Sequence, residues 1–82
     1  MRVLRLEKSN RQHKKYVADV VIDGKTYRNI HFGDSRYQQF KDSTPLKLYS
    51  ELDHLDNERR LKYHQRHISD GPASLLSKKF LW

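Results

Sequence analysis

The dipeptide Asp23-Gly24 limits the folds open to this chain more than any other feature, because it separates two β-rich runs. Residues 16–22 read Tyr-Val-Ala-Asp-Val-Val-Ile, and residues 25–32 read Lys-Thr-Tyr-Arg-Asn-Ile-His-Phe. Asp-Gly is a preferred sequence for a two-residue type I′ turn, in which both central residues need a positive φ. The sequence therefore predicts an antiparallel hairpin over residues 16–32.

A two-residue turn also sets the register of the hairpin. The predicted cross-strand pairs are Ile22–Lys25, Val20–Tyr27, Asp19–Arg28 and Val17–Ile30. One face then carries Val17, Val21, Ile30, Phe32 and the charge-matched pair Asp19–Arg28. The other face carries Tyr16, Ala18, Val20, Ile22 and Tyr27. Because both faces are partly apolar, we expect both to be partly covered.

Residues 1–7 contain Val3, Leu4 and Leu6 and are expected to add a third strand. A lone hairpin is barely stable in water, so a further strand would stabilise this one. Residues 9–15 then form a polar, basic connection.

A helix start is predicted at Thr44-Pro45, with Thr44 as the N-cap and Pro45 at the first helical position. Leu48, Leu52 and Leu55 follow at helical spacing. This pattern favours a short helix in the segment after the sheet.

Two further helices are predicted near the end of the sequence. Asp56 is placed to cap a helix over residues 57–67, and residues 73–82 form a short helix with Leu76 and Phe80 four positions apart. The predicted fold class is α+β, with a small antiparallel sheet followed by two or three short helices.

The length of 82 residues indicates a single domain, 1–82. A chain this small buries only about 60–65% of its unfolded surface, so we expect no deep catalytic cleft and no enzyme activity. Cysteine is absent, which excludes disulfide frameworks and thiolate chemistry. No phosphate-binding glycine loop and no run of 18 apolar residues is present, so we expect no cofactor, no small-molecule substrate and no membrane partner.

The net charge of +7 is concentrated in two blocks. Residues 1–15 have a balance of +5 and residues 57–67 a balance of +3, whereas residues 16–56 have a balance of −2. A polyanion or acidic partner would therefore meet the ends of the sequence. The candidate contacts are Arg2, Arg5, Arg11, Lys14, Lys15, Arg59, Arg60 and Arg66. A solvated surface that keeps the protein soluble is the alternative.

Histidine and tyrosine side chains are candidates for a metal site and for a base-stacking surface, respectively. His54, His64 and His67 lie close in sequence, but their spacing matches no standard zinc signature, so no metal site is predicted. The five tyrosines either border a small core or stack on nucleic-acid bases, and the core interpretation is favoured. They are Tyr16, Tyr27, Tyr37, Tyr49 and Tyr63.

The sequence closes on Leu81-Trp82. Tryptophan is favoured at the centres of protein interfaces. These two residues are therefore predicted either to anchor an interface with another protein or to pack back on the sheet.

Residues 14–82 resemble a known family. The matching residues are Lys14-Lys15-Tyr16, Phe32-Gly33, Tyr37, Asp42, Asp56, Arg59-Arg60, Tyr63, Arg66-His67, Leu76-Ser77 and Leu81-Trp82. Their order and spacing over residues 14–82 resemble a family of small basic, uncharacterised proteins of large eukaryotic DNA viruses, with relatives in tailed phages. Residues 42–55 depart from the pattern, because this segment is longer and richer in leucine than the short acidic link found in the family. The resemblance implies a viral source and no particular reaction.

The expected function is that of a minor structural component of a virion, in contact with viral capsid proteins and also with DNA or RNA. The alternative is a genome-associated or free nucleic-acid-binding protein that acts through basic patches 1–15 and 59–66. The expected location is the virion, or the cytoplasm or nucleus of an infected cell.

Overall fold

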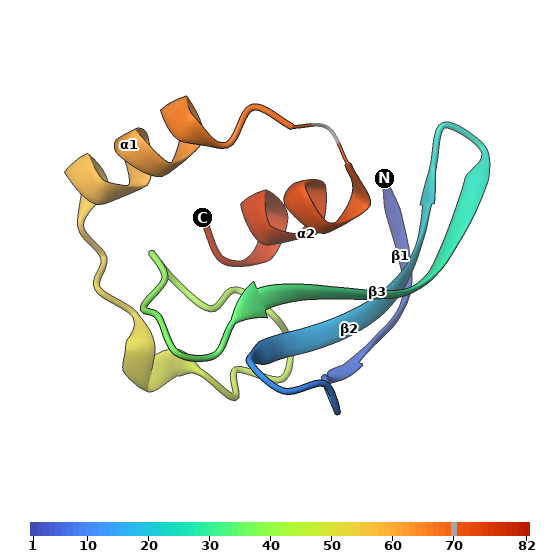
Figure 1. The fold of residues 1–82 in the computed structure, drawn as a ribbon, viewed down its shortest axis with the longest axis horizontal. Coiled ribbons are helices and arrows are strands. Elements are labelled where there is room, and N and C mark those ends of the chain that lie inside the picture. Colours follow the sequence, from blue (N-terminus) through green and yellow to red (C-terminus); the bar gives the residue numbers. More distant parts are fainter. Residues whose placement is uncertain (70) are drawn as a thin grey trace.

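A three-stranded antiparallel sheet opens the computed structural model, which describes residues 1–69 and 71–82. Its strands are β1 (Arg2–Lys8), β2 (Lys14–Ile22) and β3 (Lys25–Asp34), in that spatial order. A 3-10 turn, η1 (Ser50–Leu52), and two helices, α1 (Asn57–Arg66) and α2 (Pro72–Phe80), follow (Figure 1). The α+β class, the hairpin and the third strand are confirmed.

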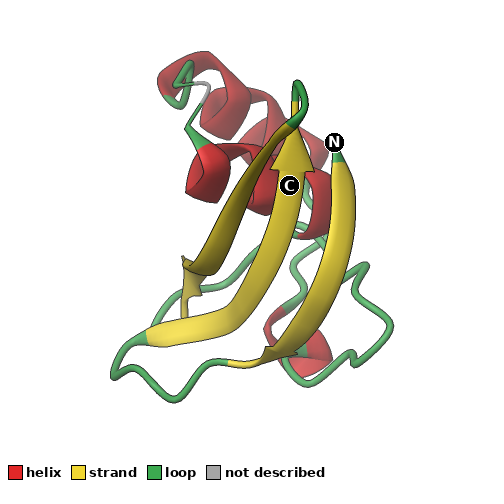
Figure 2. Ribbon diagram, turned by 90° about the vertical axis from the view of Figure 1, so that its right-hand side faces the viewer, coloured by secondary structure: helices red, strands yellow, loops and turns green. Residues whose placement is uncertain are grey.

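The helices lie on one face of the sheet, and no described helix covers the other face (Figure 2). α2 packs on β3, where the Phe80 ring stacks on Phe32 with centroids 6.1 Å apart. In Figure 1, α2 lies between α1 and the sheet. The buried core between sheet and helices consists of Tyr16, Ala18, Val20, Phe32, Leu76 and Leu81.

A β-bulge changes the register halfway along the hairpin. Ile22 pairs with Lys25 and Val20 with Tyr27, as predicted, but beyond Asp19 the register shifts by one residue. The extra residue is on β3, where Asn29 has a φ of 54°. Asparagine tolerates this left-handed conformation better than most residues.

The bulge reverses which side chains of β3 enter the core, because a one-residue shift exchanges the two faces of a strand. Phe32 pairs with Tyr16 and is buried beside it. The predicted pair Val17–Ile30 is wrong, since Val17 pairs with His31. The predicted pair Asp19–Arg28 falls at the bulge, where Arg28 and Asn29 of β3 both stand opposite Asp19.

The helix predicted after Thr44-Pro45 is wrong. Within residues 43–55 the only helical turn is η1. Lys47 and Leu55 have φ values of 49° and 55°, which a right-handed helix does not allow.

The buried carboxylate of Asp42 explains this irregular path. It accepts the main-chain N–H groups of Thr44 at 3.0 Å and Tyr49 at 3.1 Å, and the Tyr16 hydroxyl donates to it at 2.5 Å. Side chains that bind nearby main-chain groups in this way compete with helix formation. The tertiary contact with Tyr16 thus replaces the local helix.

The other two helix predictions are confirmed. Asp56 caps α1, with its Oδ1 accepting the N–H of Glu58 at 2.9 Å and of Arg59 at 3.3 Å. α2 begins at Pro72, which fits the first helical turn because proline has no N–H to leave unpaired. Neither of these helices has the length and apolar character that a membrane span requires, and the same holds throughout the described residues.

Gly33 allows the end of the chain to close over the sheet. Its φ is 76°, and a Cβ at this position would lie 2.7 Å from Leu81 Cδ1. Leu81, which is 1% exposed, therefore packs where a side chain on residue 33 would otherwise stand.

Candidate nucleic-acid interface

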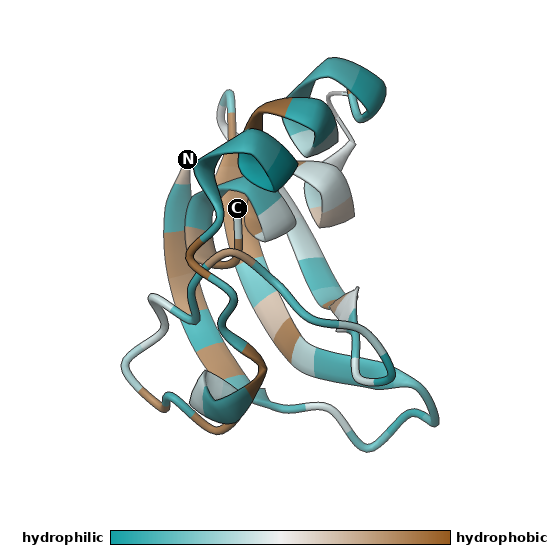
Figure 3. Ribbon diagram, turned by 90° about the vertical axis from the view of Figure 1, so that its left-hand side faces the viewer, coloured by the Kyte–Doolittle hydropathy of each residue, from teal (hydrophilic) through white to brown (hydrophobic). Residues whose placement is uncertain are grey.

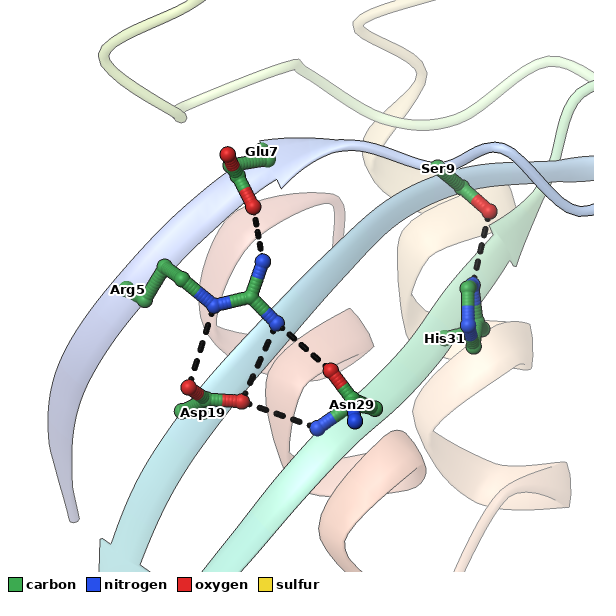
Figure 4. Close-up of polar contacts among 6 residues, drawn as sticks. All are labelled: Arg5, Glu7, Ser9, Asp19, Asn29 and His31. Atoms are coloured by element: carbon green, nitrogen blue, oxygen red, sulfur yellow. Dashed lines mark hydrogen bonds and ion pairs between the residues drawn. The ribbon is translucent and has the colours of Figure 1, made fainter.

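Arg5 lies at the centre of a polar cluster on the open face of the sheet (Figure 4). Its Nε donates to Asp19 Oδ2 at 3.0 Å, its Nη2 donates to Asn29 Oδ1 at 2.8 Å, and its Nη1 contacts Glu7. Arg5 and the Asn29 N–H together lower the pKa of Asp19 to about 2. Arg5 thus joins the three strands, and these contacts compete with the phosphate contact predicted for it.

A hollow of about 540 Å³ adjoins this cluster on the same face. His31 lines it and has its Nδ1 2.7 Å from the Ser9 hydroxyl. Burial lowers the pKa of His31, and the nearby positive charges of Arg11, Lys14 and Arg5 lower it further. The residues around the hollow are Arg5, Glu7, Lys8, Asn10, Arg11, Val17, Asn29 and His31.

Lys15 is inside the protein, contrary to its prediction as a surface contact. The side chain is 2% exposed, and its Nζ donates to the Tyr37 carbonyl at 2.9 Å and to Gln39 Oε1 at 2.5 Å. Burial lowers the pKa of Lys15, and neighbouring carboxylates partly oppose the change. Lys15 binds the loop after β3 to the sheet, and Lys15 is therefore not part of a surface interface.

One face of α1 gathers three cations around a hollow of about 200 Å³. Arg59, Lys62 and Arg66 stand at three- and four-residue spacing, which places them on one side of a helix. Arg59 Nη1 donates to Gln38 Oε1 at 2.9 Å, and Lys62 makes an exposed ion pair with Glu58 at 3.5 Å. Such an exposed pair is weak. Among the described residues that line this hollow, none is acidic.

Three stacked rings form the wall of this hollow. Trp82 and Tyr63 are nearly parallel, at 3°, with centroids 4.3 Å apart. His67 stacks on Tyr63 at 4.0 Å and 16°. We call these three residues the ring stack. The same three residues line a second hollow, of about 350 Å³, together with Lys14 and Tyr37 among others. The ring stack therefore separates two hollows.

Trp82 packs back within the chain: its ring stacks on Tyr63 of α1, and its side chain also packs against the core that the sheet and α2 share. Its carbonyl oxygen accepts Arg60 Nε at 2.7 Å and lies 3.0 Å from His64 Nε2. The Arg60 guanidinium also lies 4.6 Å from the centre of the Phe40 ring. Arg60 is thus engaged within the chain, although the sequence places it beside Arg59.

The structure divides the first basic block, because Lys14 lines the hollow of about 350 Å³ beside the ring stack whereas other members lie elsewhere. Arg11 borders the hollow on the open face of the sheet, whereas Arg59 and Arg66 lie on α1, on the side of the sheet that carries the helices. Arg2 is exposed on β1. Figure 3 shows that α1 is hydrophilic over most of its length, and the helix buries no side chain completely.

Sequence reasoning missed Lys62 and the ring stack. The spacing of Arg59, Lys62 and Arg66, and of Tyr63 and His67, held the signal for one helix face. The position of Trp82 on Tyr63 had no such signal, because nineteen positions separate the two residues. Within the described residues, no three metal-ligating side chains lie together.

Comparisons of the chain with protein-family models, with curated proteins and with solved structures give no match.

Proposed function

We propose that this protein binds nucleic acid through the face of α1 that carries Arg59, Lys62 and Arg66. The observation that supports this function is the meeting of three cations around one hollow whose wall is the ring stack. Basic side chains supply sequence-independent affinity for phosphates, and aromatic rings beside them are typical of nucleic-acid-binding surfaces. The role is binding without a chemical step.

The salt dependence of binding tests this proposal. Affinity for a labelled oligonucleotide, measured by fluorescence anisotropy, should fall linearly on logarithmic axes as salt rises. Arg59→Gln and Arg66→Gln should each lower the slope by about one, because each removes one phosphate contact. Arg11→Gln is the matched control, since it removes the same charge from the open face of the sheet.

Two results would contradict the proposal. One is no measurable binding at low salt. The other is an equal loss of slope in Arg11→Gln and Arg66→Gln, because the affinity would then follow net charge and not the face of α1.

A second candidate function is a minor structural component of a virion. The loop before α1 exposes Leu46, Leu48 and Leu55, with 42%, 44% and 58% of their surfaces accessible. Exposed leucines in one segment favour contact with another protein, and the resemblance to viral proteins makes capsid proteins the expected partners.

Purified particles would be opened, treated with nuclease and washed at about 1 M salt, where charges are screened beyond about 3 Å. Retention with the shells supports this function, and release with the nucleic acid contradicts it.

A further inference from the structure

The ring stack has one covered end and one open end. At the Trp82 end, the His54 ring lies 5.2 Å away and is tilted by 52°. At the other end, His67 is exposed and has Tyr63 as its stacked neighbour. His67 directly follows the last residue of α1, so the helix holds this ring beside its basic face.

Cations stand on both sides of this open ring. The hollow of about 200 Å³ carries Arg59, Lys62 and Arg66, and the hollow of about 350 Å³ carries Lys14. Asp34 also lines the second hollow, and its carboxylate is paired with Arg36. A phosphate chain that crosses the ring stack would therefore meet positive charge before and after the crossing. The base carried at the crossing point would lie over the rings.

We infer that His67 receives one unpaired base of a single-stranded nucleic acid, as the next ring of the stack. This inference rests on the proposed function and specifies its substrate. Bases inside a duplex are stacked on both faces, so only an unpaired base offers a free face to a protein ring. Stacking on an aromatic side chain is tolerant of sequence, because every base has a π-face.

An abasic strand separates stacking from charge. The probes are a labelled oligothymidylate of about ten nucleotides and an abasic deoxyribose-phosphate strand of the same length, which carry the same number of phosphates. The 82-residue protein should bind the oligothymidylate at least about fivefold more tightly than the abasic strand.

Two substitutions at His67 test where the base stacks. His67→Ala should abolish the preference for the strand that carries bases, and His67→Phe should retain it, because phenylalanine keeps the flat ring without the ring nitrogens. His31→Ala is the matched control on the open face of the sheet and should leave the preference unchanged. The emission of Trp82, the sole tryptophan, shows in each variant whether Tyr63 and Trp82 remain stacked.

The outcomes distinguish the two proposals. Equal affinity for the two strands would overturn base stacking and leave nucleic-acid binding by charge in place. A preference that survives in His67→Ala, or that is lost equally in His67→Phe, would overturn the assignment to the His67 ring. No binding to either strand would contradict the proposed function itself.

Discussion

The carboxylate of Asp19 accepts the main-chain N–H of Asn29 at 2.8 Å, across the two strands of the hairpin. This bond lies at the bulge, where β3 changes the face that it presents to the core. Arg5 binds both residues from β1, so one guanidinium holds the bulge from the third strand. The arrangement of the core therefore depends on a polar cluster on the opposite, open face of the sheet.

The left-handed conformation of Asn29 leads to a first prediction. Asn29→Val should destabilise the protein by about 1–2 kcal/mol relative to Asn29→Gly, because a β-branched residue is strained at positive φ whereas glycine is not. Both substitutions remove the same contact with Arg5. Urea unfolding measures the difference, and equal free energies of unfolding would contradict it.

Asp19 should contribute to acid sensitivity. Its pKa is about 2 in the folded protein and 3.8 ordinarily, so the folded state favours the charged form. The stability that this group supplies is fully present above its ordinary pKa and is lost as the pH falls through about 2. Between pH 3.8 and about 2, the free energy of unfolding should therefore fall less steeply in Asp19→Asn than in the wild-type protein. Parallel curves for the two proteins would show that Asp19 does not titrate in this way.

The hydroxyl of Tyr16 should stabilise the loop that replaces the predicted helix. It donates to Asp42 and accepts the N–H of Leu48 at 3.0 Å. Tyr16→Phe leaves both groups without this partner and should cost about 1–3 kcal/mol. Tyr37→Phe is the control, because Tyr37 is 63% exposed and its substitution should change stability by less than about 0.5 kcal/mol.

The raised pKa of Tyr16 leads to a prediction for alkaline pH, where the free energy of unfolding should fall. Burial and Asp42 raise its pKa to about 12 from an ordinary value of 10. Its contribution to stability is thus complete below pH 10 and is lost as the pH rises towards 12. The wild-type protein should lose this stability over that interval, and Tyr16→Phe should lack this part of the loss. An identical decline in both proteins would assign it to other groups.

Gly33 and Gly24 form a matched pair for a further prediction. Both have positive φ, of 76° and 77°, but a Cβ at Gly33 would meet Leu81 whereas one at Gly24 would meet nothing within 4 Å. Gly24→Ala should cost about 1 kcal/mol through strain alone, and Gly33→Ala should cost at least about 1 kcal/mol more through overpacking. Thermal or urea unfolding provides the comparison, and equal costs would mean that Leu81 does not pack there.

The attachment of α1 should depend on Trp82. The helix buries no residue completely, and Trp82 contacts it through Tyr63, Arg60 and His64. Trp82→Leu should accelerate hydrogen exchange of the α1 amides while the amides of β2 remain protected, because the core does not include α1. Trp82→Phe keeps an aromatic ring and should have a smaller effect. Unchanged exchange in α1 would show that other contacts hold the helix.

The accuracy of the sequence predictions followed the range of the interactions. The Asp23-Gly24 turn and the Asp56 cap depend on neighbouring residues, and both are confirmed in detail. The helix after Thr44 was wrong because the Asp42 carboxylate, held by Tyr16 from a distant strand, binds the main-chain groups of that segment. Local spacing contains no information about such a partner.

In the candidate site, too, local spacing predicted the positions of some residues correctly, and long-range contacts decided those of the others. The spacing along α1 places Arg59 and Arg66 on one face, and the structure brings them to one hollow. Lys15 and Arg60 belong to the same basic blocks, yet both are bound within the chain. Charge counted along a sequence does not distinguish an exposed cation from one that joins two segments.

The sequence by itself determined the hairpin, the third strand, the two helices and the two blocks of positive charge. The hairpin and the two helices follow from turn chemistry, capping and spacing within a few residues, and the third strand and the charge blocks follow from the composition of short segments. The tertiary structure alone decided which face of β3 is buried, because one left-handed residue at the bulge shifts the register by one position. It also decided that Trp82 stacks on Tyr63, because that contact forms only when α2 has brought the end of the chain back to α1. Such contacts join residues that are far apart in the sequence, and local sequence patterns carry no information about which distant residues meet.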